Sequence, residues 1–261
     1  MFIDKEKYVS HIKDQEKVIS MRRLIDKIQI VLNNHFYEAT DFLDPYERFL
    51  AKSILNRFIE IDYLENGGLN ETERQIMVIY PEYFSQELLP QHLTVLRVEG
   101  NLERLTHKDF LGAILNLGIK RSKIGDILVH EDYTDIIVKK EIGDFILLNL
   151  DKVGNKTIHL EEKSVEDLTP VKVLYKELNR TLSSYRLDVY ISATYNLSRQ
   201  ESMDIIKAQY VKVNWEPIDR PAKELVVGDI ISVRGYGRSI LHSTYGLSSK
   251  GKIKANIRIL I

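Results

Sequence analysis

The chain has 261 residues, of which 44% are hydrophobic and 29% are charged, a composition that supports packed globular domains. It lacks cysteine, which excludes disulfides and thiolate metal sites, and no apolar run approaches the roughly 20 residues of a membrane-spanning helix. The N-terminus is charged and is followed by no apolar signal core, so we expect a cytoplasmic protein that does not contact the membrane.

Residues 1–82 predict an N-terminal α+β domain. Apolar residues recur at steps of three and four from Val18 to Leu32, which indicates a helix with one buried face. Asp44 and Pro45, followed by Glu47, predict the capped start of a second helix. Two strands are expected after it, near residues 59–63 and 76–80.

Residues 83–165 predict a second domain. Strands are expected at residues 93–98, 126–130, 133–138 and 157–160, with one helix after Thr106 and another over 145–150. This β-α-β-β-α-β order is ferredoxin-like and is shared with RNA-recognition domains. The aromatic platform that such domains expose on their central strands is not evident, and the fold alone does not give a function.

Residues 166–182 predict a linker with a polar helix near 173–178, and residues 183–261 a third, C-terminal domain with a basic tail. A short helix is expected after Arg186, and a second helix after Ser198, which with Glu201 forms the S-x-x-E capping pattern. Strands are expected at residues 211–214 and 230–233, separated by a turn at 227–229. The fold class is therefore α+β, with several domains.

Charge is distributed unevenly among the predicted domains. Residues 182–261 contain 12 Lys and Arg against 7 Asp and Glu, whereas the rest of the chain contains 25 against 31. A basic C-terminal domain suggests a polyanionic partner for that domain alone, and the acidic remainder leaves room for protein partners. Chance scatter of charge is the alternative explanation.

The C-terminal domain also contains the candidate binding residues. The backbone N–H groups after Ser198 lie at a positive helix end, and Arg199 occupies the first turn, where its planar guanidinium suits a phosphate. We expect a basic face lined by Arg186, Arg199, Lys207 and Lys212. Taken singly, each signal has a structural explanation, since capped helices and solvated lysines are common in proteins of any function.

The ordered set is more specific, and it resembles the RNA-binding domain of ribosomal protein S4, called here the S4 domain. The resemblance rests on Arg186-Leu187-Asp188, Ser198-Arg199, the strand from Val211 to Asn214, and Val227-Gly228-Asp229. It implies RNA contacts at six positions: Arg186, Ser198, Arg199, Lys207, Lys212 and Asn214. Two residues depart from the pattern, because Gln209 and Trp215 stand where glycine is usual; Trp215 could serve packing or base stacking.

Nearly the whole chain resembles the YlmH family. The resemblance rests on three segments of the middle domain (105–112, 117–121 and 124–127) and on Arg234-Gly235-Tyr236-Gly237-Arg238. It implies binding to ribosomal RNA and tRNA on the large ribosomal subunit, in ribosome-associated quality control of stalled nascent chains. Arg234 and Arg238 become further candidate RNA contacts, with Tyr236 as a stacking residue, although the segment could also be a simple flexible turn.

Three cations of the middle domain, Lys120, Arg121 and Lys123, could provide a second phosphate contact or simply place favourable charge at a helix end. An enzyme is not expected, because the sequence contains no compact glycine-rich cofactor loop, no metal-ligand spacing and no convincing nucleophile–base pair. We therefore predict no catalytic residue, no metal and no cofactor. The alternatives are a role as accessory to an RNA-modifying enzyme and a role as a protein-interaction scaffold.

Overall fold

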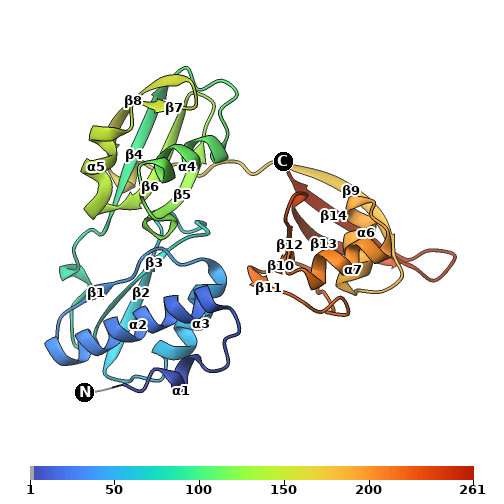
Figure 1. The fold of residues 1–261 in the computed structure, drawn as a ribbon, viewed down its shortest axis with the longest axis horizontal. Helices are drawn as coiled ribbons and strands as arrows, with labels where there is room; N and C mark the ends of the chain where they lie inside the picture. Colours follow the sequence, from blue (N-terminus) through green and yellow to red (C-terminus); the bar gives the residue numbers. More distant parts are fainter. Residues whose placement is uncertain (1–2) are drawn as a thin grey trace. The chain divides into compact units, whose positions relative to one another are not determined.

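The computed structural model describes residues 3–261, which form two compact units that divide between Val171 and Lys172 (Figure 1). Both units combine helices with antiparallel sheets, and the first unit contains two sheets. The predicted class, α+β with several domains, is confirmed. We call residues up to 171 the first unit and residues 172–261 the second unit.

The N-terminal part of the first unit packs helices on a three-stranded sheet of order β1-β3-β2. The helices are α1 (Glu6–Val9), α2 (Gln15–Asn34) and α3 (Pro45–Leu55), and the strands are β1 (Glu38–Ala39), β2 (Ile61–Asn66) and β3 (Ile76–Pro81). α2 buries its predicted stripe, including Met21, Ile25 and Ile28, which are fully buried. The predicted capping box of α3 is present, because the Asp44 side chain accepts from Glu47 N at 2.8 Å and Asp44 N donates to Glu47 Oε2 at 2.9 Å.

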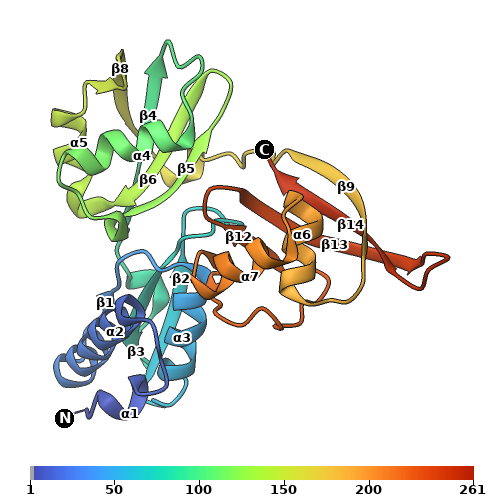
Figure 2. The same cartoon turned by 45° about the vertical axis from the view of Figure 1, so that its right-hand side comes forward.

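The middle part of the first unit has a five-stranded sheet of order β5-β6-β4-β8-β7. Its main strands are β4 (Leu93–Gly100), β5 (Ile124–Val129), β6 (Tyr133–Lys139) and β8 (Lys156–Lys163), with a short β7 (Lys152–Val153). α4 (His107–Asn116) follows β4, and α5 (Gly143–Asn149) follows β6. This order and antiparallel pairing give the predicted ferredoxin-like topology with an added edge strand. α4 and α5 pack against one face through Phe110, Ile114 and Ile146 (Figure 2).

The other face of this sheet is largely covered by the N-terminal part of the first unit. Val95 and Ile137 from the middle sheet pack into one buried cluster with Phe42, Val78 and Tyr80. β3 can serve both cores because all six of its residues are buried. The chain closes over the cluster with Leu168, after the one-turn helix η4 (Val165–Asp167).

The remaining one-turn helices connect the elements of the first unit. They are η1 (Gln86–Leu88), η2 (Arg121–Lys123) and η3 (Lys140–Ile142), which precede β4, β5 and α5 respectively.

The second unit is a six-stranded antiparallel sheet of order β11-β10-β12-β13-β14-β9, with two helices on one face. The helices are α6 (Leu187–Tyr195) and α7 (Arg199–Lys207). The strands are β9 (Tyr175–Leu182), β10 (Val211–Val213), β11 (Glu216–Pro217), β12 (Ile230–Val233), β13 (Gly237–Leu247) and β14 (Ile253–Leu260). The core joins Leu187, Tyr190 and Ile191 of α6 to Ile231 and Leu241 of the sheet.

The prediction of a polar helix near residues 173–178 is wrong. Residues 175–182 instead form β9, which pairs along its whole length with β14, from Tyr175 opposite Leu260 to Leu182 opposite Ile253. Leu182 and Leu178 contribute to the core from one face of this strand, while the other face is polar. β9 is therefore an integral edge strand of the second unit, although the sequence places it in a linker.

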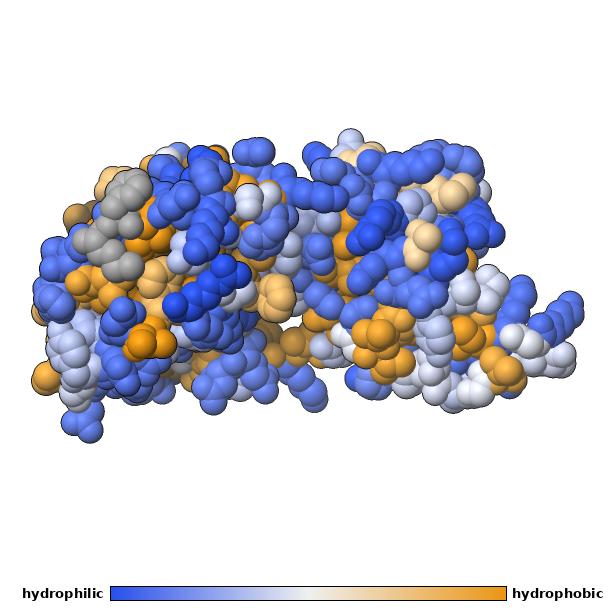
Figure 3. All heavy atoms as spheres, turned by 90° about the horizontal axis from the view of Figure 1, so that it is seen from below, coloured by the Kyte–Doolittle hydropathy of each residue, from blue (hydrophilic) through white to orange (hydrophobic). Residues whose placement is uncertain are grey.

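Within residues 3–261, no helix is both long and apolar enough to span a bilayer. On the face drawn in Figure 3, hydrophilic residues predominate and the apolar residues form separate groups between them.

Candidate nucleic-acid interface

The first turns of α6 and α7 meet at the carboxylate of Asp188. Asp188 is the second residue of α6, and its side chain has no exposed surface. Its Oδ1 accepts from Arg186 Nε at 2.9 Å, while its Oδ2 accepts from Arg186 Nη2 at 3.0 Å and from Arg199 Nε at 3.2 Å. Two guanidinium groups share one carboxylate, so this cluster has one positive charge in excess.

The two arginines of this cluster differ in exposure. The Arg199 side chain is 62% exposed and the Arg186 side chain 35% exposed. Arg199 uses only Nε for the carboxylate, which leaves its terminal amino groups for an acceptor outside the protein. The sequence prediction that Arg186 and Arg199 lie together is consistent with this geometry, and Asp188 is the residue that orients them.

Burial of Asp188 opposes its ionisation, but the hydrogen bonds from Arg186 and Arg199 outweigh that effect. They hold the pKa of Asp188 below its usual value of 3.8. The same interaction raises the pKa of the Arg186 guanidinium. The cluster is therefore fully ionised at neutral pH.

Ser198 is the N-cap of α7, and its polar groups form hydrogen bonds within that helix. Its hydroxyl accepts from Glu201 N at 3.1 Å, and its own N–H donates to Glu201 Oε2 at 2.8 Å. The Glu201 carboxylate also places negative charge at the helix start, and these hydrogen bonds lower its pKa. Ser198 thus fixes the position of Arg199 in the first turn of α7.

A second basic group lies across three neighbouring strands of the sheet. Lys212 of β10 pairs with Ser232 of β12, and Ser232 pairs with Arg238 of β13. Directly paired residues project from the same face of an antiparallel sheet, so Lys212 and Arg238 share a face. Their neighbours Val211 and Val213 are buried on the opposite face.

Aromatic rings accompany these cations. The Arg238 guanidinium carbon lies 5.5 Å from the Trp215 ring centroid, and that of Arg234 lies 5.1 Å from the Tyr210 ring. Cations at such distances interact favourably with the ring face. An exposed ring beside an arginine provides both a stacking surface for a base and a charge for a phosphate.

Tyr236, in the loop between β12 and β13, contacts a second tyrosine. Its ring centroid lies 5.5 Å from that of Tyr195, whose hydroxyl contacts Ser239 at 3.1 Å. Tyr236 is 45% exposed, whereas Tyr195 is anchored against the sheet. The loop therefore presents one ring to solvent on a fixed support.

Asn214 and Trp215 form the two-residue turn between β10 and β11. Both have positive φ, 49° and 66°, which is the backbone that a type I′ hairpin requires. The Asn214 amide donates to Asp229 Oδ1 at 2.8 Å, and its oxygen accepts from Ile230 N at 2.9 Å. The predicted RNA contact at Asn214 therefore belongs to a side chain whose two polar groups already stabilise the sheet.

Lys207 lies in the last turn of α7, at the opposite end of that helix from Arg199. With a rise of about 1.5 Å per residue, the two are about 12 Å apart along the axis. Within residues 172–261, no hydrogen bond or ion pair joins Lys207 to Arg186 or Arg199. One continuous basic surface thus stays a prediction.

Two cations of the middle domain serve the first unit's own structure. Arg121 Nη1 donates to the carbonyl oxygens of Ile124 and Gly125, and burial lowers the pKa of Arg121 to about 10. Lys123 Nζ lies 2.7 Å from Asp41 Oδ1. Lys120 is exposed. Within residues 3–261, no group of three or more His, Asp or Glu side chains is placed to hold a metal.

Three family models match successive parts of the chain. Residues 16–84 match the model of the YlmH N-terminal domain, residues 91–167 match a model for the RNA-binding domain proposed in YlmH, and residues 186–231 match the S4 domain. The ribosome-associated protein quality control protein P2 of Bacillus subtilis (strain 168) is 31% identical over 226 residues, which cover 86% of this chain and 88% of the relative.

The chain belongs to the YlmH family. The predicted family and the C-terminal S4 domain are thereby confirmed, and the families matched are RNA-binding and ribosome-associated. A solved YlmH structure, the cell division protein YlmH from Streptococcus pneumoniae, has a TM-score of 0.50 at 24% identity, covering 60% of this chain and 96% of that one. That likeness bears on the fold alone.

The YlmH membership leaves the individual RNA contacts as predictions. Sequence reasoning named Arg186, Arg199, Arg234 and Arg238, each of which lies beside a carboxylate or an aromatic ring. It also named Lys212, which projects from the exposed face of β10. It missed Asp188 as the shared anchor of two arginines, and Tyr195 and Tyr210 as ring partners. The spacing of Asp188 two residues after Arg186 was a visible signal, whereas the ring contacts depend on strand pairing distant in sequence.

Proposed function

We propose that this YlmH-family protein acts in the cytoplasm and binds ribosomal RNA and tRNA on the large ribosomal subunit through its second unit. The proposal rests on one observation above all, the exposed Arg199 guanidinium oriented with Arg186 by the buried Asp188 carboxylate. A preoriented arginine pair loses little side-chain freedom on meeting a phosphate, so it favours binding of structured RNA.

We further propose a role in quality control of stalled nascent chains. The support is the family together with the printed name of the Bacillus subtilis relative, which describes ribosome-associated protein quality control. The acidic charge balance of the rest of the chain favours protein partners there.

The test of RNA binding compares the wild type with the double substitution Arg199→Ala and Lys212→Ala, measuring affinity for purified large subunits at several salt concentrations. Each lost phosphate contact should shallow the plot of log affinity against log salt by about one unit. The control is Lys176→Ala, because Lys176 is an exposed residue on β9, with three strands between β9 and β10. Equal affinity and equal slope for the double variant and the wild type would contradict the proposal.

A further inference from the structure

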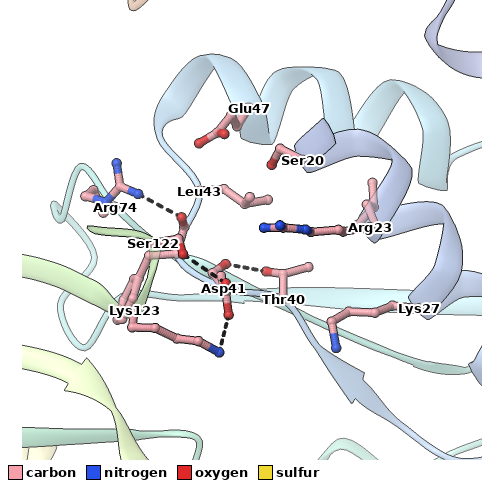
Figure 4. Close-up of a pocket in the computed structure, with 12 residues that line it drawn as sticks. Ser20, Arg23, Lys27, Thr40, Asp41, Leu43, Glu47, Arg74, Ser122 and Lys123 are labelled. Atoms are coloured by element: carbon pink, nitrogen blue, oxygen red, sulfur yellow. Dashed lines mark hydrogen bonds and ion pairs between the residues drawn. The ribbon is translucent and has the colours of Figure 1, made fainter. Parts of the chain in front are cut away.

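The first unit contains a cation-rich pocket that the RNA-binding proposal does not use. It has a volume of about 230 Å³ and lies between α2, residues 40–43, Arg74 and the Ser122–Lys123 segment (Figure 4). Four cations line it, Arg23, Lys27, Arg74 and Lys123, against two acids, Asp41 and Glu47. The pocket lining is therefore basic although residues 1–181 as a whole are acidic, with 25 Lys and Arg against 31 Asp and Glu.

Two of the four cations, Lys27 and Lys123, form ion pairs with acids. Lys27 Nζ lies 2.7 Å from Glu38 Oε2, and Lys123 Nζ lies 2.7 Å from Asp41 Oδ1. The side chains of both lysines are about 30% exposed, so neither is sealed in the core. Lys123 also pairs with Glu141, so both lysine charges are balanced by acids, and within residues 3–261 the unpaired positive charge of the lining comes from Arg23 and Arg74.

Arg74 is fixed by the backbone. Its Nη2 donates to the Phe42 carbonyl oxygen at 2.8 Å, while its Nε is buried and has no hydrogen-bond partner in the part of the chain that the structure describes. A buried donor without an acceptor costs free energy. An anion in the pocket would offset part of this cost by attracting the positively charged Arg74 guanidinium.

Arg23 is the decisive residue. Its guanidinium extends from α2 into the pocket, beside Leu43 and Thr40 (Figure 4). Among residues 3–261, it has neither an ion-pair nor a hydrogen-bond partner, in contrast to its neighbour Arg22, which pairs with Glu6. An arginine aimed into a pocket with all five N–H donors unused is suited to a multivalent oxyanion.

A hydroxyl group adds to this donor set. Ser20, on the same helix as Arg23, contributes a hydroxyl, whereas the single O–H of Ser122 already donates to Asp41 Oδ2 at 3.0 Å. A phosphate group has several acceptor oxygens and up to two negative charges, which matches this combination of cations and a hydroxyl better than a single carboxylate does.

We propose that this pocket binds the phosphate group of a small phosphorylated ligand or of an RNA 5′ end, with Arg23 as the main contact. The pocket is smaller than the roughly 300–1,000 Å³ typical of sites for drug-sized ligands, so it accommodates a phosphate and a small attached group rather than a nucleic-acid duplex. Ser122 and Lys123 come from the middle domain and the other lining residues from the N-terminal part, so binding would tie the two parts together.

Isothermal titration of the full chain with inorganic phosphate, pyrophosphate and 5′-AMP tests the proposal. We expect binding by the wild type to weaken at least tenfold in Arg23→Gln and to remain in Arg22→Gln, the matched control on the same helix. A parallel arm compares short RNAs with a 5′ phosphate or a 5′ hydroxyl, in the Arg199→Ala and Lys212→Ala background that removes the proposed RNA contacts of the second unit.

The two arms separate the sources of the phosphate. Arg23-dependent binding of free phosphate, pyrophosphate or 5′-AMP would indicate a small ligand, and an Arg23-dependent preference for the 5′-phosphorylated RNA alone would indicate an RNA end. The proposal is overturned if none of these probes binds at millimolar concentration, or if Arg22→Gln weakens binding as much as Arg23→Gln. Because Arg23 is exposed, thermal unfolding of Arg23→Gln should match the wild type without phosphate.

Discussion

At the scale of single residues, Asp188 is the key to the RNA-binding proposal. It contacts no RNA in our account, yet it fixes both Arg186 and Arg199 by three hydrogen bonds. An anionic acceptor buried beneath two arginines stabilises the fold and reduces the motion of the groups that would meet phosphate.

We predict that Asp188→Asn lowers the free energy of unfolding by about 1–3 kcal/mol, since charge-assisted hydrogen bonds are lost from a buried position. RNA affinity should fall as well, because the two guanidinium groups are no longer held. Urea unfolding and large-subunit binding of the same variant measure both effects. Unchanged values in the two experiments would show that the carboxylate orients nothing.

The lowered pKa of Asp188 also sets a pH dependence. A carboxyl whose pKa is depressed by folding stabilises the protein above its unfolded value of 3.8, and that contribution disappears as the pH falls through the folded pKa. The stability gap between wild type and Asp188→Asn should therefore stay constant from pH 7 to about pH 4 and narrow below it. A gap that widened in acid would have the wrong sign.

Gln209 offers a test of backbone strain. It has φ 59° just after α7, where its N–H donates to the Ile206 carbonyl and Tyr210 N donates to the Ile205 carbonyl, as in a Schellman motif. Glycine takes this conformation without a Cβ clash, so Gln209→Gly should raise the free energy of unfolding by up to about 1 kcal/mol. Chemical denaturation measures it, with Gln200→Gly inside α7 as a control that should destabilise.

The sequence predicts the local structure around these residues, but it does not predict all of their hydrogen-bond partners. The capping boxes at Asp44 and Ser198 follow from local chemistry, and both are present. Asn214 was expected to contact RNA, but its side chain bonds to Asp229 and Ile230, fifteen and sixteen residues away. Such partners are set by strand pairing, which local patterns do not contain.

At the scale of elements, the prediction failed mainly at β9. Its polar, weakly alternating sequence does not resemble a strand, because only Leu178 and Leu182 reach the core and the remaining residues face solvent or the sheet edge. Pairing with β14 supplies the missing stabilisation. Edge strands in which only one or two side chains reach the core are therefore hard to distinguish from linkers by sequence.

The loop between β12 and β13 is the element on which base stacking can be tested. Tyr236 has an exposed ring supported by Tyr195. We predict that Tyr236→Ala weakens RNA binding by about 1–3 kcal/mol, the usual cost of one lost stack, and that Tyr236→Phe retains binding. Equal loss in both variants would assign the effect to the hydroxyl, and no loss in either would remove the loop from the interface.

At the scale of the whole molecule, the two helices and four strands predicted for the middle domain have the order of an RNA-recognition domain. The structure shows that much of the sheet face opposite the helices packs on Phe42, Val78 and Tyr80 instead. Where that sheet continues, Arg97 pairs with Asp135 at 2.8 Å and covers the Tyr133 ring at 4.0 Å. The order of strands and helices was predictable from the sequence. Burial of one face of the middle sheet by the N-terminal part was not, because the apolar sequence of β3 is equally compatible with packing in a single core.

RNA binding through the second unit is our central proposal, and crosslinking tests it directly. Ultraviolet irradiation of the full-length protein on large ribosomal subunits, followed by mass spectrometry of the crosslinked peptides, maps the contacts. We predict that crosslinked peptides cluster within residues 186–238, including the segments with Arg199, Lys212 and Tyr236. Crosslinks confined to residues 91–167, with none beyond residue 172, would contradict the account.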